Sequence, residues 1–217
     1  MKVLELFAGS RSIGNVCDDL GYNVFSSDIN PFDNINYVVD INKFDVSVVP
    51  FIPDFIWASP PCTYFSVASI GKHWNKNNTP KSDNALKGVE YVKSTLKIIN
   101  YFNLLNPNLN WFMENPRGKL RKLNIVKGLP RTTVWYCKYG DTRAKPTDIW
   151  SNNIWNPLFN TNGWKPREKC FNGNKYCHHE IAPRGSRTGT QGLKGNYNRS
   201  KIPQQLCEDI VKANDRT

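Results

Sequence analysis

The sequence predicts an α/β fold with a doubly wound, mostly parallel sheet and a small irregular C-terminal subdomain. Short apolar strands alternate with helical stretches through residues 1–150, which is typical of a parallel sheet. Acidic, thiol and glycine residues recur where these strands end. From residue 151 to about residue 197 the composition changes to Asn, Gly, Lys and Arg, which indicates long loops or a small irregular unit.

The elements follow in order from local patterns. Residues 3–7 form an apolar run typical of a buried strand, residues 9–14 a turn, and residues 13–20 a helix that Gly21 ends. Further strands are expected at 23–27, 37–39, 55–58 and 110–113. Apolar residues at helical spacing predict a helix over 84–105, and a strand pair is expected at 132–137 and 147–150. A final helix spans 203–213.

We therefore expect three parts. Residues 1–150 form a ligand-binding catalytic domain, residues 151–196 a small recognition region, and residues 197–217 a segment that packs back on the first part.

The charge balance points to a polyanionic partner. The chain of 217 residues carries a net charge of +11 although only 22% of its residues are charged. Lys and Arg that neutralise phosphates gain from counterion release, which favours nucleic acid; a merely basic soluble protein is the alternative. The first residues are too short and too acidic for a signal peptide, and no apolar run is long enough to span a bilayer. We expect a cytoplasmic protein without disulfides, so its six cysteines need other roles.

Three groups of residues at strand ends carry chemistry. The first is the turn from Phe7 to Gly14, with Asp28 after the next strand. Glycine lets a ligand approach the backbone and a carboxylate there can bind ribose hydroxyls, but the G-x-G-x-x-G pattern is missing. A tight turn without ligand is the alternative.

The second group is Cys62 after Pro60 and Pro61. The prolines stiffen the loop, and a helix that starts after the cysteine would lower its pKa. A buried structural cysteine is the alternative, but the strand-end position favours a nucleophile.

The third is Glu114, which is followed by Asn115 and Pro116 at the end of a buried strand. Taken alone, Glu114 is best interpreted as a structural carboxylate with a paired partner. Because the carboxyl ends of parallel strands share one edge, Cys62 and Glu114 together predict a nucleophile and a proton donor in one pocket.

Three motifs resemble those of the DNA cytosine-C5 methyltransferases: Leu6-Phe7-Ala8-Gly9, then Pro60-Pro61-Cys62 with Phe65-Ser66, then Glu114-Asn115-Pro116. Their order also matches, and the resemblance covers residues 1–150. It implies a Rossmann-like methyltransferase sheet, S-adenosyl-L-methionine as cofactor, and double-stranded DNA as partner, bound by a monomer that flips the cytosine out of the duplex.

The resemblance also implies roles for single residues. Cys62 would attack C6 of cytosine while Glu114 holds its N3 and exocyclic amine. Cofactor contacts would come from Phe7, Ala8, Gly9, Ser10, Gly14, Asp28, Ile29, Asp40, Ile41, Pro60 and Ser200. DNA contacts would come from Ser66, Arg117, Lys145, Arg184, Arg187 and Arg199.

The chain departs from the family pattern in two places. The family has Gln-x-Arg-x-Arg after a Tyr-Gly, whereas Gly140 here precedes a segment with Arg143 and Lys145. Arg143 is then expected in catalysis near the cytosine O2, and a turn with solvated charges is the alternative. The recognition region is also reduced, which implies a short or relaxed recognition sequence.

Two alternatives stay open for the function, and one for a metal. The chain could be a catalytically silent methyltransferase-like protein that binds nucleic acid, or a C5 methyltransferase acting on RNA. We expect no metal, with buried cysteines and phosphate-facing histidines in the recognition region. Zinc at Cys170, Cys177, His178 and His179 is the alternative, and a fourth ligand could also be Cys137.

Overall fold

The computed structural model describes residues 1–67, 69–155, 163–180, 193 and 195–215. Their centre is a seven-stranded sheet in the order β3-β2-β1-β4-β5-β7-β6. The strands are β1 Lys2–Leu6, β2 Asn23–Asp28, β3 Tyr37–Val38, β4 Phe55–Ala58, β5 Asn110–Pro116, β6 Arg131–Trp135 and β7 Pro146–Ser151. The pairs from β3 to β5 are parallel, and β7 pairs antiparallel with β5 and β6. This confirms the predicted α/β fold.

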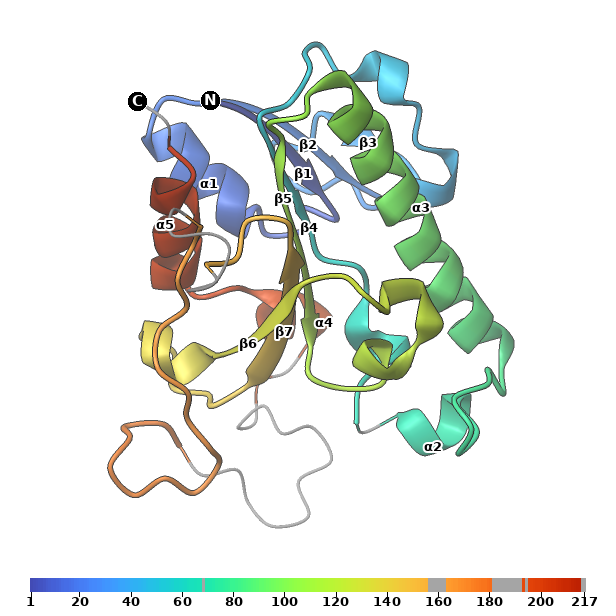
Figure 1. Cartoon of the computed structure of the whole chain (residues 1–217), viewed down its shortest axis with the longest axis vertical. Helices are drawn as coiled ribbons and strands as arrows, with labels where there is room; N and C mark the ends of the chain where they lie inside the picture. The colour runs from blue at the N-terminus through green and yellow to red at the C-terminus, as the bar shows by residue number, and fades with distance from the viewer. Residues whose placement is uncertain (68, 156–162, 181–192, 194, 216–217) are drawn as a thin grey trace.

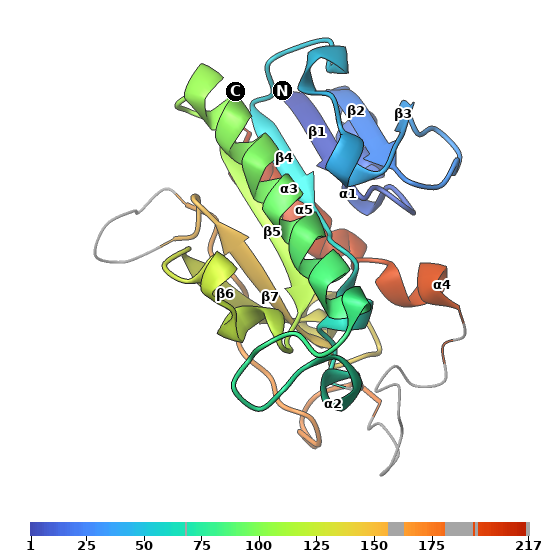
Figure 2. The same ribbon diagram turned by 90° about the vertical axis from the view of Figure 1, so that its right-hand side faces the viewer.

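Helices cover both faces of the sheet (Figure 1). α1 Ser12–Asp19 and α5 Gln204–Ala213 lie on one face, and α3 Asp83–Leu105 lies on the other. In the turned view α3 crosses in front of β4 and β5, and the short α2 Ile70–His73 lies near the carboxyl end of the sheet (Figure 2). α4 Asn196–Ser200 precedes α5 in the chain. Because both faces are covered, the central strands are buried along almost their whole length, from Phe55 to Ala58 in β4 and from Asn110 to Asn115 in β5.

Each face of the sheet has its own apolar core. On the α3 side, Leu4, Ile56 and Met113 of the sheet pack with residues of α3 such as Val92 and Phe102. On the other side, Val3 and Phe55 pack with Leu206 and Ile210 of α5. The end of the chain therefore forms part of the same core as its first strand.

Two boundaries differ from the sequence expectation. β5 continues through Glu114 to Pro116, because its last residues pair with β7 in the register Glu114 to Ile149 and Pro116 to Thr147. β6 ends at Trp135, and Tyr136–Tyr139 forms a 3-10 helix instead. Glu114 therefore lies inside β5 and pairs with Ile149 of β7, one residue beyond the last pair with β4 at Met113.

Residues 163–180 contain no helix or named strand. Trp164 fixes the start of this segment, because it is buried beside Phe112 and forms an isolated bridge with Ile154. Across the part of the chain that the structure describes, no helix has the length and apolar character that a membrane crossing requires.

Candidate active site

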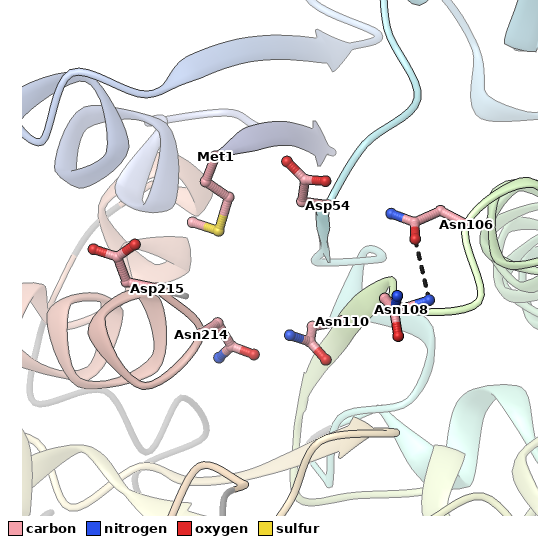
Figure 3. Close-up of a pocket in the computed structure, with 7 residues that line it drawn as sticks. All are labelled: Met1, Asp54, Asn106, Asn108, Asn110, Asn214 and Asp215. Carbon is pink, nitrogen blue, oxygen red and sulfur yellow. Dashed lines mark hydrogen bonds between the residues drawn. The ribbon is translucent and has the colours of Figure 1, made fainter. Parts of the chain in front are cut away.

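Two cavities lie at opposite ends of the sheet. One of about 390 Å³ lies at the amino ends of the strands (Figure 3). It is lined by Met1, Asp54, Asn106, Asn108, Asn110, Asn214 and Asp215, which offer no nucleophile. The other, of about 150 Å³, lies at the carboxyl ends, beside the point where the strand order reverses between β1 and β4. Ligands of doubly wound folds bind at that point, so the smaller cavity marks the site.

The carboxyl-end cavity collects five of the eleven residues expected to contact a cofactor, namely Phe7, Asp28, Ile29, Asp40 and Ile41. Its lining is Phe7, Ser27, Asp28, Ile29, Val39, Asp40, Ile41, Pro61, Tyr64 and Tyr91. Asp28 and Asp40 offer carboxylates for hydroxyl or amine groups, and the rest of the wall is mostly apolar or aromatic. A cavity of this size is smaller than the roughly 300–1,000 Å³ of complete ligand sites, so it fits only part of a ligand.

Five lining residues escaped the sequence reasoning: Ser27, Val39, Pro61, Tyr64 and Tyr91. Pro61 lines the cavity, whereas Pro60 is buried next to it and is not part of the wall. Tyr91 projects from α3, whose sequence shows only the apolar spacing of a covering helix. No local pattern marks a tyrosine on such a helix as a ligand contact.

The turn after β1 has an unusual backbone. Phe7, Gly9 and Arg11 have φ values of 57°, 50° and 51°. Non-glycine residues rarely adopt this left-handed conformation, and it concentrates at functional sites. The Gly9 N–H donates to Asp28 Oδ2 at 3.0 Å, so the turn also fixes the carboxylate at the end of β2.

Gly14 has a different role from the one expected. A Cβ on Gly14 would lie 2.6 Å from Oε2 of the buried Glu5, so glycine is needed for α1 to approach β1. Burial raises the pKa of Glu5 to about 7. Gly14 therefore lets α1 pack closely on β1 and is not part of the cavity wall.

The loop after β4 presents Cys62 and is tied down at several carbonyl groups. Asn115 Nδ2 donates to the Pro60 carbonyl at 2.8 Å, and Trp74 Nε1 donates to the Tyr64 carbonyl at 2.6 Å. The Lys119 N–H donates to the Phe65 carbonyl at 2.7 Å. Cys62 is half-buried and opens a single 3-10 turn, Cys62–Tyr64.

The expectation that a helix would lower the pKa of Cys62 is wrong. Only three residues are helical here, because side chains and a neighbouring strand end take the carbonyls that a longer helix would use. Burial raises the pKa of the Cys62 thiol, the nearby Lys145 ammonium lowers it, and the Glu114 carboxylate raises it again. The net pKa lies above that of an ordinary cysteine, so the resting group is a thiol.

Glu114 is buried at the end of β5 and accepts a 3.0 Å hydrogen bond from the Tyr136 hydroxyl. Burial raises its pKa, against the opposing effects of Lys145 and of the Tyr136 bond. The Lys145 ammonium lies 4.5 Å from the centre of the Tyr136 ring. Cys62, Glu114, Tyr136 and Lys145 thus form one electrostatic cluster, hereafter the thiol–acid cluster. Tyr136 was missed, because nothing in its local sequence separates it from a core aromatic.

Arg143 lies beside the thiol–acid cluster, with its guanidinium 5.8 Å from the centre of the Tyr136 ring. Its guanidinium pairs with Asp141 and also donates to the carbonyls of Arg199 and Lys201 at 3.3 and 3.4 Å. These contacts join the loop after β6 to the segment before α5. Lys145, which was expected on DNA phosphates, is the cation that acts on Cys62 and Glu114.

Two of the residues expected on DNA lie side by side, because the Lys145 ammonium donates to the Arg199 carbonyl at 3.1 Å. Arg117 is exposed and lies over the Trp135 ring at 5.2 Å, whereas Ser66 is half-buried and bonds to Ser69 at 2.9 Å. Arg199 donates to the Gly195 carbonyl at 3.2 Å. The remaining two, Arg184 and Arg187, lie outside the described residues.

The remaining residues that were expected to bind the cofactor or a metal do not line the carboxyl-end cavity. Ala8 and Ser10 lie in the turn after β1, where Ser10 bonds to Ser12 at 3.0 Å, but neither lines the cavity. Ser200 is exposed and bonds to the Tyr197 carbonyl at 2.8 Å. Among the cysteines and histidines, Cys170, Cys177 and His179 come together with Cys137, and the exposed His178 is not in that group.

Comparisons with known proteins agree with this geometry. No family profile matches the sequence. The chain is 31% identical over 160 residues to the "Probable DNA (cytosine-5)-methyltransferase" of Frog virus 3, a match that covers 70% of this chain and 71% of the viral protein.

Among solved structures, the methyltransferase EhMeth of Entamoeba histolytica superposes with a TM-score of 0.51 at 14% identity, over 78% of this chain. Such low identity shows the fold alone. The Dnmt2 methyltransferase of S. pombe gives 0.45 at 13% identity over 70% of this chain, too distant to carry an argument. The chain spans 57% and 48% of the lengths of these two proteins.

Proposed function

Because this chain belongs to the DNA (cytosine-5)-methyltransferase family, we propose that it transfers a methyl group from S-adenosyl-L-methionine to C5 of cytosine in double-stranded DNA, through a covalent adduct of Cys62. The observation that carries the proposal is the thiol–acid cluster. A thiol and a buried carboxyl group lie within electrostatic range of each other and of one lysine, at the carboxyl edge of the sheet. A module that only bound nucleic acid would need neither group.

The chain's own residues account for the steps at cytosine. C5 of cytosine is a weak nucleophile until a thiolate adds to the neighbouring C6. Cys62 loses its proton to solvent and its sulfur forms the bond to C6, while Lys145 stabilises the developing thiolate. Burial raises the pKa of Glu114, which favours a carboxyl group that shares a proton with N3 and so makes C6 electrophilic. After C5 has taken the methyl group, loss of the C5 proton and cleavage of the S–C6 bond release the thiolate.

The carboxyl-end cavity suits part of the cofactor. Asp28 and Asp40 would hold hydroxyl and amine groups of its adenosine, against the apolar Ile29, Ile41 and Tyr91. When bound, S-adenosyl-L-methionine supplies the electrophilic methyl group. Pro61 lies between this cavity and Cys62, so the two reactants would meet at the loop that carries the thiol.

The partner is proposed to be duplex DNA from which one cytosine is flipped, because a stacked base shields C6 from attack. The net charge of +11 favours a polyanion, and Arg117 is an exposed cation two residues past the motif of Glu114 and Asn115. Action as a monomer and in the cytoplasm belongs to the same proposal. The family relation and the cluster both favour this over the silent binding protein.

The test is a methylation assay on the full chain. Labelled S-adenosyl-L-methionine is incubated with a mixed-sequence DNA duplex or with RNA of the same sequence, and the digested products are analysed for 5-methylcytosine. The proposal expects label at C5 in the duplex, and a loss of about 10³-fold or more for Cys62→Ser. If label appeared in RNA alone, the substrate would be RNA and not DNA. If the chain bound DNA without methyl transfer, it would be the catalytically silent binding protein.

A further inference from the structure

Away from the thiol–acid cluster, four potential metal ligands converge. The Sγ atoms of Cys137, Cys170 and Cys177 and one ring nitrogen of His179 lie within 4.8 Å of one another. Cys170 Sγ is 3.7 Å from His179 Nδ1. In tetrahedral zinc sites, with Zn–S of about 2.3 Å and Zn–N of about 2.0 Å, neighbouring ligand atoms are about 3.4–3.8 Å apart. The four groups therefore already have nearly the spacing that zinc requires.

The surroundings of the four groups also suit a metal. Cys137, Cys170 and His179 are buried, at 1%, 4% and 5% exposure. His179 presents its Nδ1 to Cys170 Sγ, so Nδ1 is the ring nitrogen that is placed to bind the metal. Asn174 Nδ2 lies 3.6 Å from Cys170 Sγ and donates to it, as outer groups do around metal-bound thiolates.

We propose that Cys137, Cys170, Cys177 and His179 bind one structural zinc ion. Thiolate and imidazole together select zinc among the common divalent ions. Four protein ligands complete a tetrahedron and leave no open position, so the ion has a structural and not a catalytic role. The exposed His178 takes no part, although it is adjacent in sequence.

The zinc ion joins the recognition region to the catalytic domain. Cys137 belongs to the 3-10 helix Tyr136–Tyr139, so it directly follows the tyrosine that bonds to Glu114. The other ligands come from residues 170–179, which contain no helix or strand. The Glu180 N–H donates to the Thr142 carbonyl at 2.9 Å, so the residue after His179 is bonded to the loop that runs from Cys137 to Lys145. A segment with so little regular structure needs a bound metal to fix it on the loop that carries Lys145.

The experiment measures zinc in the full chain, purified without chelator from zinc-supplemented cells. We expect one zinc per chain, and a cobalt-substituted sample with the thiolate-to-metal and d–d absorption bands of tetrahedral Co²⁺. Cys137→Ser and His179→Ala should lose most of the metal, whereas His179→Cys, which replaces one zinc ligand by another, should keep it. The control His178→Ala should retain a full equivalent.

Cys62→Ser separates this inference from the proposed activity, because it should abolish methyl transfer and retain the zinc. If the serine variants do not fold, stripping zinc from the folded wild-type chain with a chelator should make residues 163–180 newly sensitive to limited proteolysis. A metal-free wild-type chain, with its thiols free or paired in a disulfide, would overturn the inference. So would a zinc content that His178→Ala lowers as much as His179→Ala does.

Discussion

The side-chain amide of Asn115 donates a 2.8 Å hydrogen bond to the backbone carbonyl of Pro60. The strand that carries Glu114 therefore also holds the loop that carries Cys62. Asn115 is fully buried, and its amide oxygen has no partner among the described residues, so the bond to Pro60 is its main polar contact. Asn115 thus acts as a positioning residue for the thiol.

Asn115→Ala should lower kcat by about 10–100-fold, because a displaced thiol loses its attack geometry. The KM for S-adenosyl-L-methionine should change little, since Asn115 does not line the cavity. Asn152→Ala is the control at the other end of β5, where the exposed Asn152 side chain donates a 2.7 Å bond to the Leu109 carbonyl and accepts a 3.0 Å bond from the Trp111 N–H. Each variant should lose about 1 kcal/mol of unfolding free energy. If both variants lost the same fraction of kcat, the loss in Asn115→Ala would come from lower stability and not from a displaced thiol.

The pKa of Cys62 gives a second prediction. Because burial raises it, the thiolate fraction at neutral pH is smaller than for a free cysteine, whose pKa is about 8.5. The rate of Cys62 alkylation by iodoacetamide, followed by peptide mass spectrometry, should therefore still rise with pH above about 8.5.

Two substitutions test whether Lys145 and Glu114 shift the pKa of Cys62. Lys145→Met removes the cation that lowers the thiol pKa, so the alkylation midpoint should move to higher pH. Glu114→Gln removes the anion that raises it, so the midpoint should move to lower pH. Shifts in the opposite directions would contradict the thiol–acid cluster.

The sequence predicted those parts of the site that depend on local patterns. Strand ends could be read from short apolar runs, so Cys62, Glu114, Asp28 and Asp40 were all expected at one edge of the sheet. Tyr136 escaped, and Lys145 was expected only as a DNA contact, because their positions depend on the antiparallel pairing of β6 and β7 with β5. That pairing leaves no periodic signal at either residue.

The helix expected after Cys62 failed for a related reason. Whether a helix continues depends on what else bonds to its carbonyl groups, and here Trp74, just after α2, and Lys119, after β5, supply those bonds. Cys137 likewise lies far in sequence from Cys170. The spacing of cysteines and histidines in the sequence could therefore name it only as one of several candidates for the fourth zinc ligand.

Gly118 tests how closely the catalytic loop must pack. A Cβ at this residue would lie 2.3 Å from the Phe65 carbonyl oxygen, so Gly118→Ala must displace the loop or the residues after β5. We expect a loss of about 1–3 kcal/mol in unfolding free energy and a fall in kcat. Gly71→Ala is the control, because a Cβ at Gly71 meets nothing within 4 Å. Denaturation and kinetics should show Gly71→Ala close to wild type; a neutral Gly118→Ala would show that the loop is loosely held.

Two aspartates with the same local role test the cofactor cavity. Asp40 and Asp45 each accept a 2.9 Å bond from the N–H two residues later, at Asn42 and Ser47, but only Asp40 lines the cavity. Asp40→Ala should raise the KM for S-adenosyl-L-methionine by about 10-fold or more, the loss of one charge-assisted bond. Asp45→Ala should leave it unchanged. Equal effects from both would place the cofactor elsewhere.

Covalent trapping tests the central claim most directly. A duplex containing 5-fluorocytosine cannot lose the C5 substituent, so the bond between sulfur and C6 should persist after methyl transfer. With S-adenosyl-L-methionine present, the full chain should form a denaturation-resistant complex whose cross-linked peptide contains Cys62, and Cys62→Ser should form none. A chain that methylates the normal duplex but traps no fluorinated one, or that is trapped at another cysteine, would contradict the account.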